Sequence, residues 1–247
     1  MKTVIIIPAR YNSSRFPGKP LTLILGKPMI LWVAELCAKA LPIEFIYVAT
    51  EDLRIKKVVE EAGFNVVLTS KEALTGTDRT AEAAKKIDAD IYINVQGDEP
   101  LLDPTDILSI INSKKKYPKQ VINGYCKINN DEDPKSLNIP KVVFNEDHQM
   151  IYMSRQPIPG AKSNDIKPPA YFKQVCIYAF NKEELTEYIN FGRKGTLELY
   201  EDIEILRFLD IGITIRVVET KNPSLAVDVP DDVKKVETEI LKRVKIK

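Results

Sequence analysis

Three cations lie within ten residues of a loop that follows an apolar run near the N-terminus: Arg10, Arg15 and Lys19. Guanidinium groups bind phosphate oxygens in pairs, and a lysine ammonium adds a compact positive charge. No carboxylate stands between these cations in the sequence, so without an anion they would repel one another. The loop therefore predicts a site for a nucleoside triphosphate.

Carboxylates follow two other apolar runs. Asp98 and Glu99 come directly after Ile91–Val95, in the string Gln96-Gly97-Asp98-Glu99-Pro100, and Asp228 precedes Pro230. Carboxylate oxygens suit a hard divalent cation that bridges phosphates, such as Mg²⁺. Two structural alternatives stay open, because Gly97-Asp98 also fits a surface turn and Asp228 also fits a helix N-cap.

A third candidate segment is Leu74–Arg79. Thr77 is predicted to cap the following helix, which would turn backbone amides and Arg79 toward a nucleotide. An ion pair on the helix face is the alternative role for Arg79. The single histidine, His148, lies between Asp147 and Gln149 in a polar turn, so the chemistry is expected to depend on carboxylates, lysine and arginine.

The composition is that of a globular protein. The chain has 247 residues, 44% of them hydrophobic and 29% charged, with a formal net charge of +1. This balance argues against disorder and against nucleic acid as a partner, and Lys114–Lys116 are expected to be a solvated helix end. No apolar stretch approaches the roughly 20 residues of a membrane span, so the expected location is cytoplasmic. Cys37, Cys126 and Cys176 lack the spacing of a disulfide framework or a zinc site and are expected to be reduced.

Strands and helices alternate along the first hundred residues. Apolar runs predict strands, and residues with helical spacing predict helices between them. Such alternation indicates an α/β fold with a doubly wound, mostly parallel sheet, in which ligands bind at the carboxyl ends of the strands. The expected strands are Val4–Ile7, Phe45–Ala49, Asn65–Leu68 and Ile91–Val95, and the expected helices are Pro28–Ala40, Asp52–Ala62 and Thr77–Ile87.

The pattern changes after about Val121. Short strands are predicted at Val121–Ile128, Lys141–Phe144, Ile151–Ser154 and Lys173–Phe180, then a helix at Tyr200–Leu209, a strand at Ile213–Val218 and a helix from Pro230. We expect one domain over residues 1–247, in which residues 121–209 form an inserted region that binds the second substrate and a partner subunit.

Taken together, the motifs resemble a known family. They are Ile7-Pro8-Ala9-Arg10, Arg15-Phe16-Pro17-Gly18-Lys19-Pro20, Gly76-Thr77-Asp78-Arg79, Asn94-Val95-Gln96-Gly97-Asp98-Glu99-Pro100, Tyr152-Met153-Ser154-Arg155, Ile177-Tyr178 and Val227-Asp228-Val229-Pro230. In this order, over nearly the whole chain, they resemble the 3-deoxy-manno-octulosonate (KDO) cytidylyltransferases, the CMP-KDO synthetases.

The resemblance implies a Rossmann-like core of the GT-A type, a homodimer, and transfer of CMP from CTP to the anomeric hydroxyl of an acidic sugar with Mg²⁺. It implies that Arg10, Lys19, Asp98 and Asp228 are catalytic, with Asp98 and Asp228 on the metal. The implied nucleotide-binding residues are Ala9, Arg10, Arg15, Lys19, Thr77, Arg79, Gln96 and Gly97. The implied acceptor-binding residues are Arg79, Gln96, Arg155, Gln174, Tyr178, Glu201 and Glu204.

The chain departs from the family pattern at three positions. Gln174 stands where a histidine is usual, Cys176 where a glycine is usual, and Ile205 where a glutamine is usual. Polar changes in a pocket alter which analogues it rejects, so we expect an acceptor that differs from KDO at a position facing Gln174 or Ile205. The alternatives are a cytidylyltransferase for an amino-substituted KDO or another anionic metabolite, and a non-catalytic nucleotide-binding regulatory protein. A dehydrogenase is excluded because the glycine fingerprint is missing.

Overall fold

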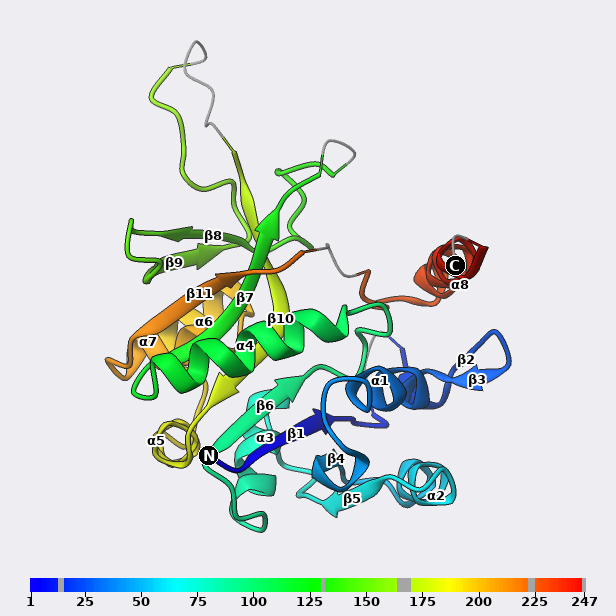
Figure 1. Ribbon diagram of the computed structural model, residues 1–247. Coiled ribbons are helices and arrows are strands. Elements are labelled where there is room, and N and C mark those ends of the chain that lie inside the picture. Colours follow the sequence, from blue (N-terminus) through cyan, green and yellow to red (C-terminus); the bar gives the residue numbers. More distant parts are fainter. Residues whose placement is uncertain (13–15, 130–131, 164–169, 222–224, 246–247) are drawn as a thin grey trace.

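A nine-stranded sheet forms the centre of the protein (Figure 1). The structure is a computed structural model that describes residues 1–12, 16–129, 132–163, 170–221 and 225–245. The strand order is β11-β7-β10-β6-β1-β4-β5, with β8 beside β10 and β9 beside β8. The strands are β1 (Thr3–Pro8), β4 (Ile46–Thr50), β5 (Asn65–Leu68), β6 (Ile91–Val95), β7 (Val121–Lys127), β8 (Lys141–Phe144), β9 (Met150–Ser154), β10 (Phe172–Phe180) and β11 (Ile215–Glu219), and β2 (Leu23–Ile24) pairs with β3 (Lys27–Pro28) separately.

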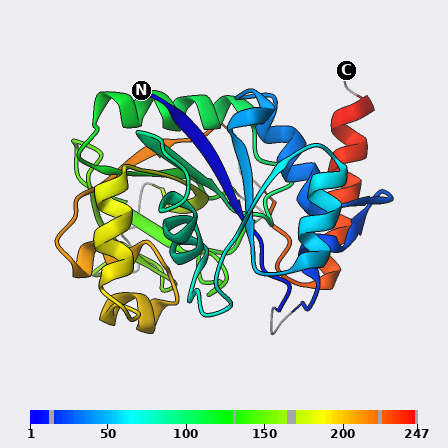
Figure 2. The ribbon, with the colours of Figure 1, turned by 90° about the horizontal axis from the view of Figure 1, so that it is seen from below.

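Helices cover both faces of the sheet (Figures 1 and 2). Apolar residues of α1, α2 and α4 pack on one face, and those of α3, α5 and α7 on the other. Among the described residues, none of the helices combines the length and apolar character needed to cross a bilayer. The helices are α1 (Met29–Cys37), α2 (Leu53–Glu61), α3 (Gly76–Ala84), α4 (Pro104–Lys116), α5 (Lys182–Asn190), α6 (Thr196–Glu201), α7 (Leu206–Asp210) and α8 (Pro230–Lys245).

The predicted α/β class and mostly parallel sheet are confirmed. β1 pairs in parallel with β4 and β6, and β4 pairs in parallel with β5. β10 runs antiparallel to β6 and β7. Because β1, β4, β5 and β6 share one direction, the loops that follow them lie along one edge of the sheet, where ligands bind in such folds.

The region 121–209 is continuous with this sheet. It supplies β7 and β10 to the main sheet and adds the β8–β9 hairpin and the helices α5, α6 and α7. Figure 1 shows the hairpin beside the upper parts of β7 and β10. Strand β10 of this region pairs directly with β6, and the acceptor-binding role of the region stays a prediction.

Two expectations about the helices are wrong. The single helix predicted at Tyr200–Leu209 is two short helices, because Asp202 adopts a left-handed conformation (φ 50°, ψ 47°) that ends α6. Lys114 is not solvated, since its side chain is 1% exposed and its Nζ donates to both carboxylate oxygens of Glu184 at 2.7 and 2.6 Å. The pKa of Lys114 is lowered by burial, against the attraction of Glu184.

The single histidine and the cysteines lie as expected. His148 is in an exposed turn, with its ring 5.6 Å from that of Phe144. Cys37 and Cys126 are buried free thiols, and Cys176 is a partly buried one.

Candidate active site

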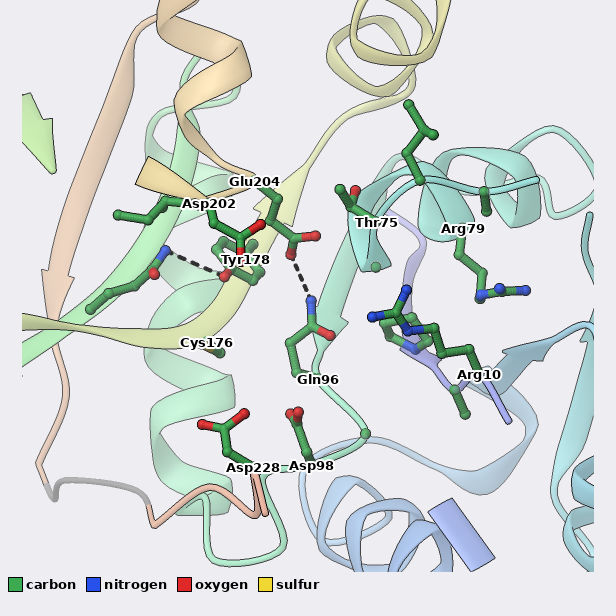
Figure 3. Close-up of a pocket in the computed structure, with 18 of the residues that line it drawn as sticks. Arg10, Thr75, Arg79, Gln96, Asp98, Cys176, Tyr178, Asp202, Glu204 and Asp228 are labelled. Carbon is green, nitrogen blue, oxygen red and sulfur yellow. Dashed lines mark hydrogen bonds between the residues drawn. The ribbon is translucent and has the colours of Figure 1, made fainter. Parts of the chain in front are cut away.

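A cleft of about 410 Å³ lies at the carboxyl edge of the parallel strands. It contains residues from the ends of β1 and β6, from the start of α3, from β10, from the α6–α7 junction and from the segment before α8. Of the residues that the sequence predicted for the site, twelve line it: Ala9, Arg10, Lys19, Arg79, Gln96, Gly97, Asp98, Arg155, Gln174, Tyr178, Glu204 and Asp228. Figure 3 shows Arg10 and Arg79 on one side of the cleft, Tyr178 and Glu204 on the other, and Gln96 between them.

Arg10 and Arg79 form the cationic wall. Arg10 follows β1 and is exposed, and Figure 3 places it close to Arg79. Arg79 is 3% exposed, its guanidinium pairs with Glu51 at 2.8 Å, and it lines the cleft. Burial lowers the pKa of Arg79, and the nearby charge of Arg10 lowers it further. An anion placed between the two arginines would relieve that repulsion.

Lys19 connects the N-terminal loop to the opposite side of the cleft floor. Its Nζ donates to Asp98 Oδ2 at 2.6 Å and to the carbonyl oxygen of Val227 at 2.9 Å. Arg15, the remaining cation predicted for the triphosphate, falls outside the described residues.

Asp98 and Asp228 lie side by side at one end of the cleft (Figure 3). The N–H of Val227 donates to the carbonyl oxygen of Asp98 at 3.0 Å, which holds the two segments together. Gly97 permits the arrangement, because a Cβ there would stand 2.8 Å from the carbonyl oxygen of Pro8. In the part of the chain that the structure describes, no cluster of three or more His, Cys, Asp or Glu side chains forms a metal site.

Two carboxylates nevertheless fit Mg²⁺, which is held in nucleotide enzymes by one or two carboxylates and completed by phosphates and water. The ammonium of Lys19 against Asp98 shows that this position attracts a cation.

The opposite wall is built on β10. Gln174, Cys176 and Tyr178 occupy alternate positions of this strand and all three line the cleft. Gln174 Nε2 donates to the hydroxyl of Tyr178 at 3.3 Å and to Oδ1 of Asn123 at 3.4 Å. Burial raises the pKa of the Tyr178 phenol well above its ordinary value, so the phenol is a neutral hydrogen-bonding group.

Glu204 and Gln96 meet across the cleft. Gln96 Nε2 donates to Glu204 Oε1 at 2.7 Å, and the backbone N–H of Thr77 donates to Glu204 Oε2 at 3.1 Å. Burial raises the pKa of Glu204.

Two predicted site residues do not line the cleft. Thr77 is 1% exposed and does not cap α3; the cap is Thr75, whose hydroxyl accepts the N–H of Asp78. Glu201 accepts hydrogen bonds from Tyr152, Ser154 and the N–H of Arg155, and so holds strand β9.

Arg155 lines the cleft, and its guanidinium donates hydrogen bonds to backbone carbonyl oxygens. It donates to the carbonyl oxygens of Glu201, Leu137 and Asp202, the last two at 2.8 Å. Arg155 therefore fixes the α6–α7 junction.

Ile205 is not a specificity residue. It is 0% exposed and belongs to the apolar cluster beneath α7, so the expectation that it faces the acceptor is wrong. Its neighbour Glu204 lines the cleft instead.

Some residues that line the cleft, or that bond to its lining residues, were not predicted from the sequence. Glu51 follows β4 at the same sheet edge and accepts the N–H of Tyr11 at 2.9 Å in addition to pairing with Arg79. The signal that could have identified Glu51 in the sequence is its position directly after an apolar strand. Lys194 and Asp202 line the cleft at the α6 ends and pair at 3.2 Å, and no spacing in the sequence indicates that contact.

Known proteins show the same organisation. A CMP-KDO synthetase solved in complex with CTP superposes with a TM-score of 0.90 at 36% identity, over 98% of this chain and 100% of that one. A 3-deoxy-manno-octulosonate cytidylyltransferase of Trichlorobacter lovleyi is 42% identical, over 95% of this chain and 97% of the relative. An 8-amino-3,8-dideoxy-manno-octulosonate cytidylyltransferase of Shewanella oneidensis is 40% identical, over 96% and 98%. The cytidylyltransferase profile matches residues 4–215, and the chain belongs to the cytidylyltransferase family.

Proposed function

We propose that the protein transfers CMP from CTP to the anomeric hydroxyl of 3-deoxy-manno-octulosonate, releases pyrophosphate, and uses Mg²⁺. The proposal rests on how charged and hydrogen-bonding groups are distributed within one cleft. Arg10, Lys19 and two carboxylates lie toward the end of β1 and β6, and a neutral and acidic hydrogen-bonding wall of β10 and Glu204 faces them. The names of the relatives support the acceptor, and we propose a role in lipopolysaccharide or capsule synthesis in the cytoplasm.

Catalysis in this arrangement is positioning and charge neutralisation. Arg10 and Lys19, with Arg15 beside them in the sequence, bind the pyrophosphate as negative charge accumulates on it. Asp98 and Asp228 would hold the metal, which would supply charge neutralisation at the phosphates and would lower the pKa of a coordinated hydroxyl. The acceptor is held by the β10 wall so that its anomeric hydroxyl lies in line with the bond that breaks between the α-phosphorus and the pyrophosphate oxygen. A histidine base is unnecessary where a bound metal lowers the pKa of that hydroxyl, so that its proton passes to solvent water.

We also propose a homodimer that forms through the 121–209 region. Large apolar side chains of that region are exposed, namely Ile151 at 61%, Leu199 at 64% and Tyr200 at 84%. They lie on β9 and α6, the elements joined by the hydrogen bonds of Glu201. Sedimentation velocity of the natural protein and of Tyr200→Asp tests this, and a monomeric natural protein contradicts it.

The test of the function is pyrophosphate release with purified protein, Mg²⁺ and KDO, comparing CTP with ATP, GTP and UTP. We expect release with CTP at a rate well above that of the other three. Equal release with all four triphosphates would contradict CTP as the donor, and no release with any acid of the KDO type would favour a nucleotide-binding regulatory protein.

An amino-substituted KDO is the second candidate acceptor. Relatives named for KDO and for the 8-amino acid match this chain almost equally, at 42% and 40% identity. Glu204 favours the amino-substituted KDO as acceptor, because this cleft carboxylate accepts its hydrogen bonds from the neutral donors Gln96 and Thr77. A partly buried carboxylate without a cationic partner gains most from an ammonium group.

A further inference from the structure

Helix α8 packs in an apolar cluster of its own, beside α1 and the β2–β3 hairpin (Figure 1). Its buried side chains, Val236 and Ile240, belong to neither of the two clusters on the faces of the sheet. The buried members of this third cluster are Ile24, Met29, Leu101, Val227, Val236 and Ile240. The cluster therefore joins α8 to the hairpin, to α1 and to two segments at the cleft floor.

Those two segments carry the carboxylates Asp98 and Asp228. Val227 directly precedes Asp228, and Leu101 lies three residues after Asp98. Val227 is 0% exposed, its N–H donates to the carbonyl oxygen of Asp98, and its own carbonyl oxygen accepts from Lys19. The packing of the cluster consequently acts on the backbone beside both carboxylates.

Polar contacts hold α8 at both ends. In its first turn, Asp232 Oδ2 accepts the backbone N–H groups of Asp228 and Val229, each at 3.1 Å. Near its other end, Arg243 Nη1 donates to the carbonyl oxygen of Leu101 at 3.0 Å. One end of α8 is thus bonded to the segment that carries Asp228, and the other end is bonded to the loop that follows β6.

Asp98 and Asp228 both lie outside the helices and strands, so their geometry depends on contacts made by neighbouring residues. We propose that α8 is a positioning element for the metal site, in which Asp232, Ile240 and Arg243 hold Asp228 beside Asp98 so that both carboxylates reach one Mg²⁺. This inference rests on the proposed function. Because coupling between two sites is reciprocal, Mg²⁺ bound with CTP stabilises the seated helix in return.

The single tryptophan of the chain reports on the seating of α8. Trp32 of α1 packs against the same cluster, and its Nε1 donates to the carbonyl oxygen of Ile24 at 2.9 Å. The ammonium of Lys27 lies 3.7 Å from the centroid of the indole ring. Trp32 does not line the cleft, so a change in its emission when Mg²⁺ binds reaches it through the cluster.

Ile240→Ala loosens α8 and leaves both carboxylates in place. We expect the Mg²⁺ concentration for half-maximal pyrophosphate release to rise about 5- to 50-fold, within the usual range of coupling between sites, while the dissociation constant of CTP without Mg²⁺ changes less than about twofold. Ile55→Ala is the matched control, because Ile55 of α2 is also buried but belongs to a cluster on the sheet. It should lower stability and leave the Mg²⁺ requirement unchanged.

Arg243→Met is a milder change, because Arg243 is an exposed residue of the helix. It removes the hydrogen bond to Leu101 and should raise the same Mg²⁺ concentration about 3- to 10-fold. Lys242→Met is its control, since Lys242 is exposed and pairs with Glu239, the carboxylate that also pairs with Arg243. This control should leave the Mg²⁺ requirement unchanged.

Two measurements without an acceptor detect the coupling directly. When natural protein at saturating CTP is titrated with Mg²⁺, the emission of Trp32 should change, with its midpoint at the Mg²⁺ concentration that half-saturates turnover. Ile240→Ala should move that midpoint to higher Mg²⁺, and Ile55→Ala should not. Amide hydrogen exchange in α8 of the natural protein should slow when Mg²⁺ is added to the CTP complex, because a seated helix opens less often.

The inference is overturned if Mg²⁺ neither changes the emission of Trp32 nor slows exchange in α8, or if Ile240→Ala and Arg243→Met need no more Mg²⁺ than their controls. Normal turnover with CTP leaves the proposed function standing in either case. Changes in emission and exchange without turnover of any KDO-type acid would support the inference and overturn the acceptor assignment alone. Circular dichroism confirms the folding of each variant.

Discussion

The ammonium of Lys19 lies 2.6 Å from Oδ2 of Asp98 and 2.9 Å from the carbonyl oxygen of Val227. One cation thereby joins the N-terminal loop, the end of β6 and the segment that carries Asp228. The cationic loop and the carboxylates were separate motifs in the sequence, and in the structure they are parts of one cleft floor. A ligand that carries phosphates and Mg²⁺ has to be accommodated by both.

Lys19→Met tests the phosphate-binding role of this ammonium. Methionine keeps an unbranched apolar stem and removes the charge. We expect kcat/KM for CTP to fall about 10²-fold, because one transition-state electrostatic contact is lost. Steady-state pyrophosphate release measures it. Lys27→Met is the matched control, since Lys27 pairs with the exposed Glu35 on the β2–β3 side and should leave turnover unchanged. Equal effects of the two variants would contradict the role of Lys19.

Asp98→Asn and Asp228→Asn test the metal site. An amide is a poor substitute for a carboxylate on Mg²⁺, so each variant should lose at least about 10²–10³ in kcat while remaining folded. Asp98→Asn also removes the ion pair with Lys19. Asp231→Asn, exposed in the first turn of α8, serves as the control. Normal turnover by Asp228→Asn would return that residue to a helix-capping role.

The features that the sequence predicted correctly are those that depend on local residue patterns. Apolar strands and the loops after β1 and β6 were placed correctly, because the direction of parallel strands brings those loops together. The features that it missed depend on contacts between residues that lie far apart in the sequence. Lys114 is buried because Glu184 lies beside it in space, and the left-handed Asp202 that ends α6 occurs within a continuous run of helix-forming residues. After that break, Glu204 lines the cleft and Ile205 is buried in the core.

Arg207→Met should destabilise the fold strongly. Arg207 is 0% exposed, binds both Asp78 and Glu198, and lies 3.9 Å over the ring of Tyr188. Removing one partner leaves buried carboxylates uncompensated, which costs about 3–5 kcal/mol of unfolding free energy. Urea denaturation measures this loss. Lys57→Met, in an exposed pair with Glu61, should change the unfolding free energy by less than about 0.5 kcal/mol. A loss below about 1 kcal/mol for Arg207→Met would show that the network is not stabilising.

The acceptor reaction should depend on the ionisation of Glu204. Burial raises its pKa, and the charge of Asp78 raises it further; Tyr178 and Tyr188 face it as neutral phenols because their own pKa values are raised. A protonated Glu204 carries a donor where Gln96 and Thr77 already donate, so acceptor kcat/KM should fall as pH drops through this raised pKa. The sign for stability is the opposite: the folded state holds the proton more tightly, so unfolding free energy decreases as pH rises from the ordinary to the raised pKa.

A pH series of acceptor kcat/KM, run upward from the ordinary titration range of a glutamate, measures this limb. Glu204→Gln is the control, because its residual activity should lack the limb. If natural protein and Glu204→Gln show the same acidic limb, another group is responsible.

Gln174→His tests which acid the cleft prefers. Gln174 lies in the β10 wall and is bonded to Tyr178 and Asn123, and Cys176 narrows the same strand face where a glycine is usual in the family. The alternative acceptor, an amino-substituted KDO, depends on these two positions and not on Ile205. That alternative requires kcat/KM for the amino-substituted acid to exceed kcat/KM for KDO by at least about tenfold, since a mismatched buried hydrogen bond costs about 1–3 kcal/mol. Gln174→His should shift this ratio toward KDO, whereas Gln149→His, outside the cleft lining, should leave it unchanged. The measurement is steady-state kinetics with both acids at saturating CTP. If the natural protein already uses KDO with kcat/KM near about 10⁵ M⁻¹s⁻¹, an ordinary enzyme rate, then Gln174 and Cys176 do not select the acceptor and KDO itself is the substrate.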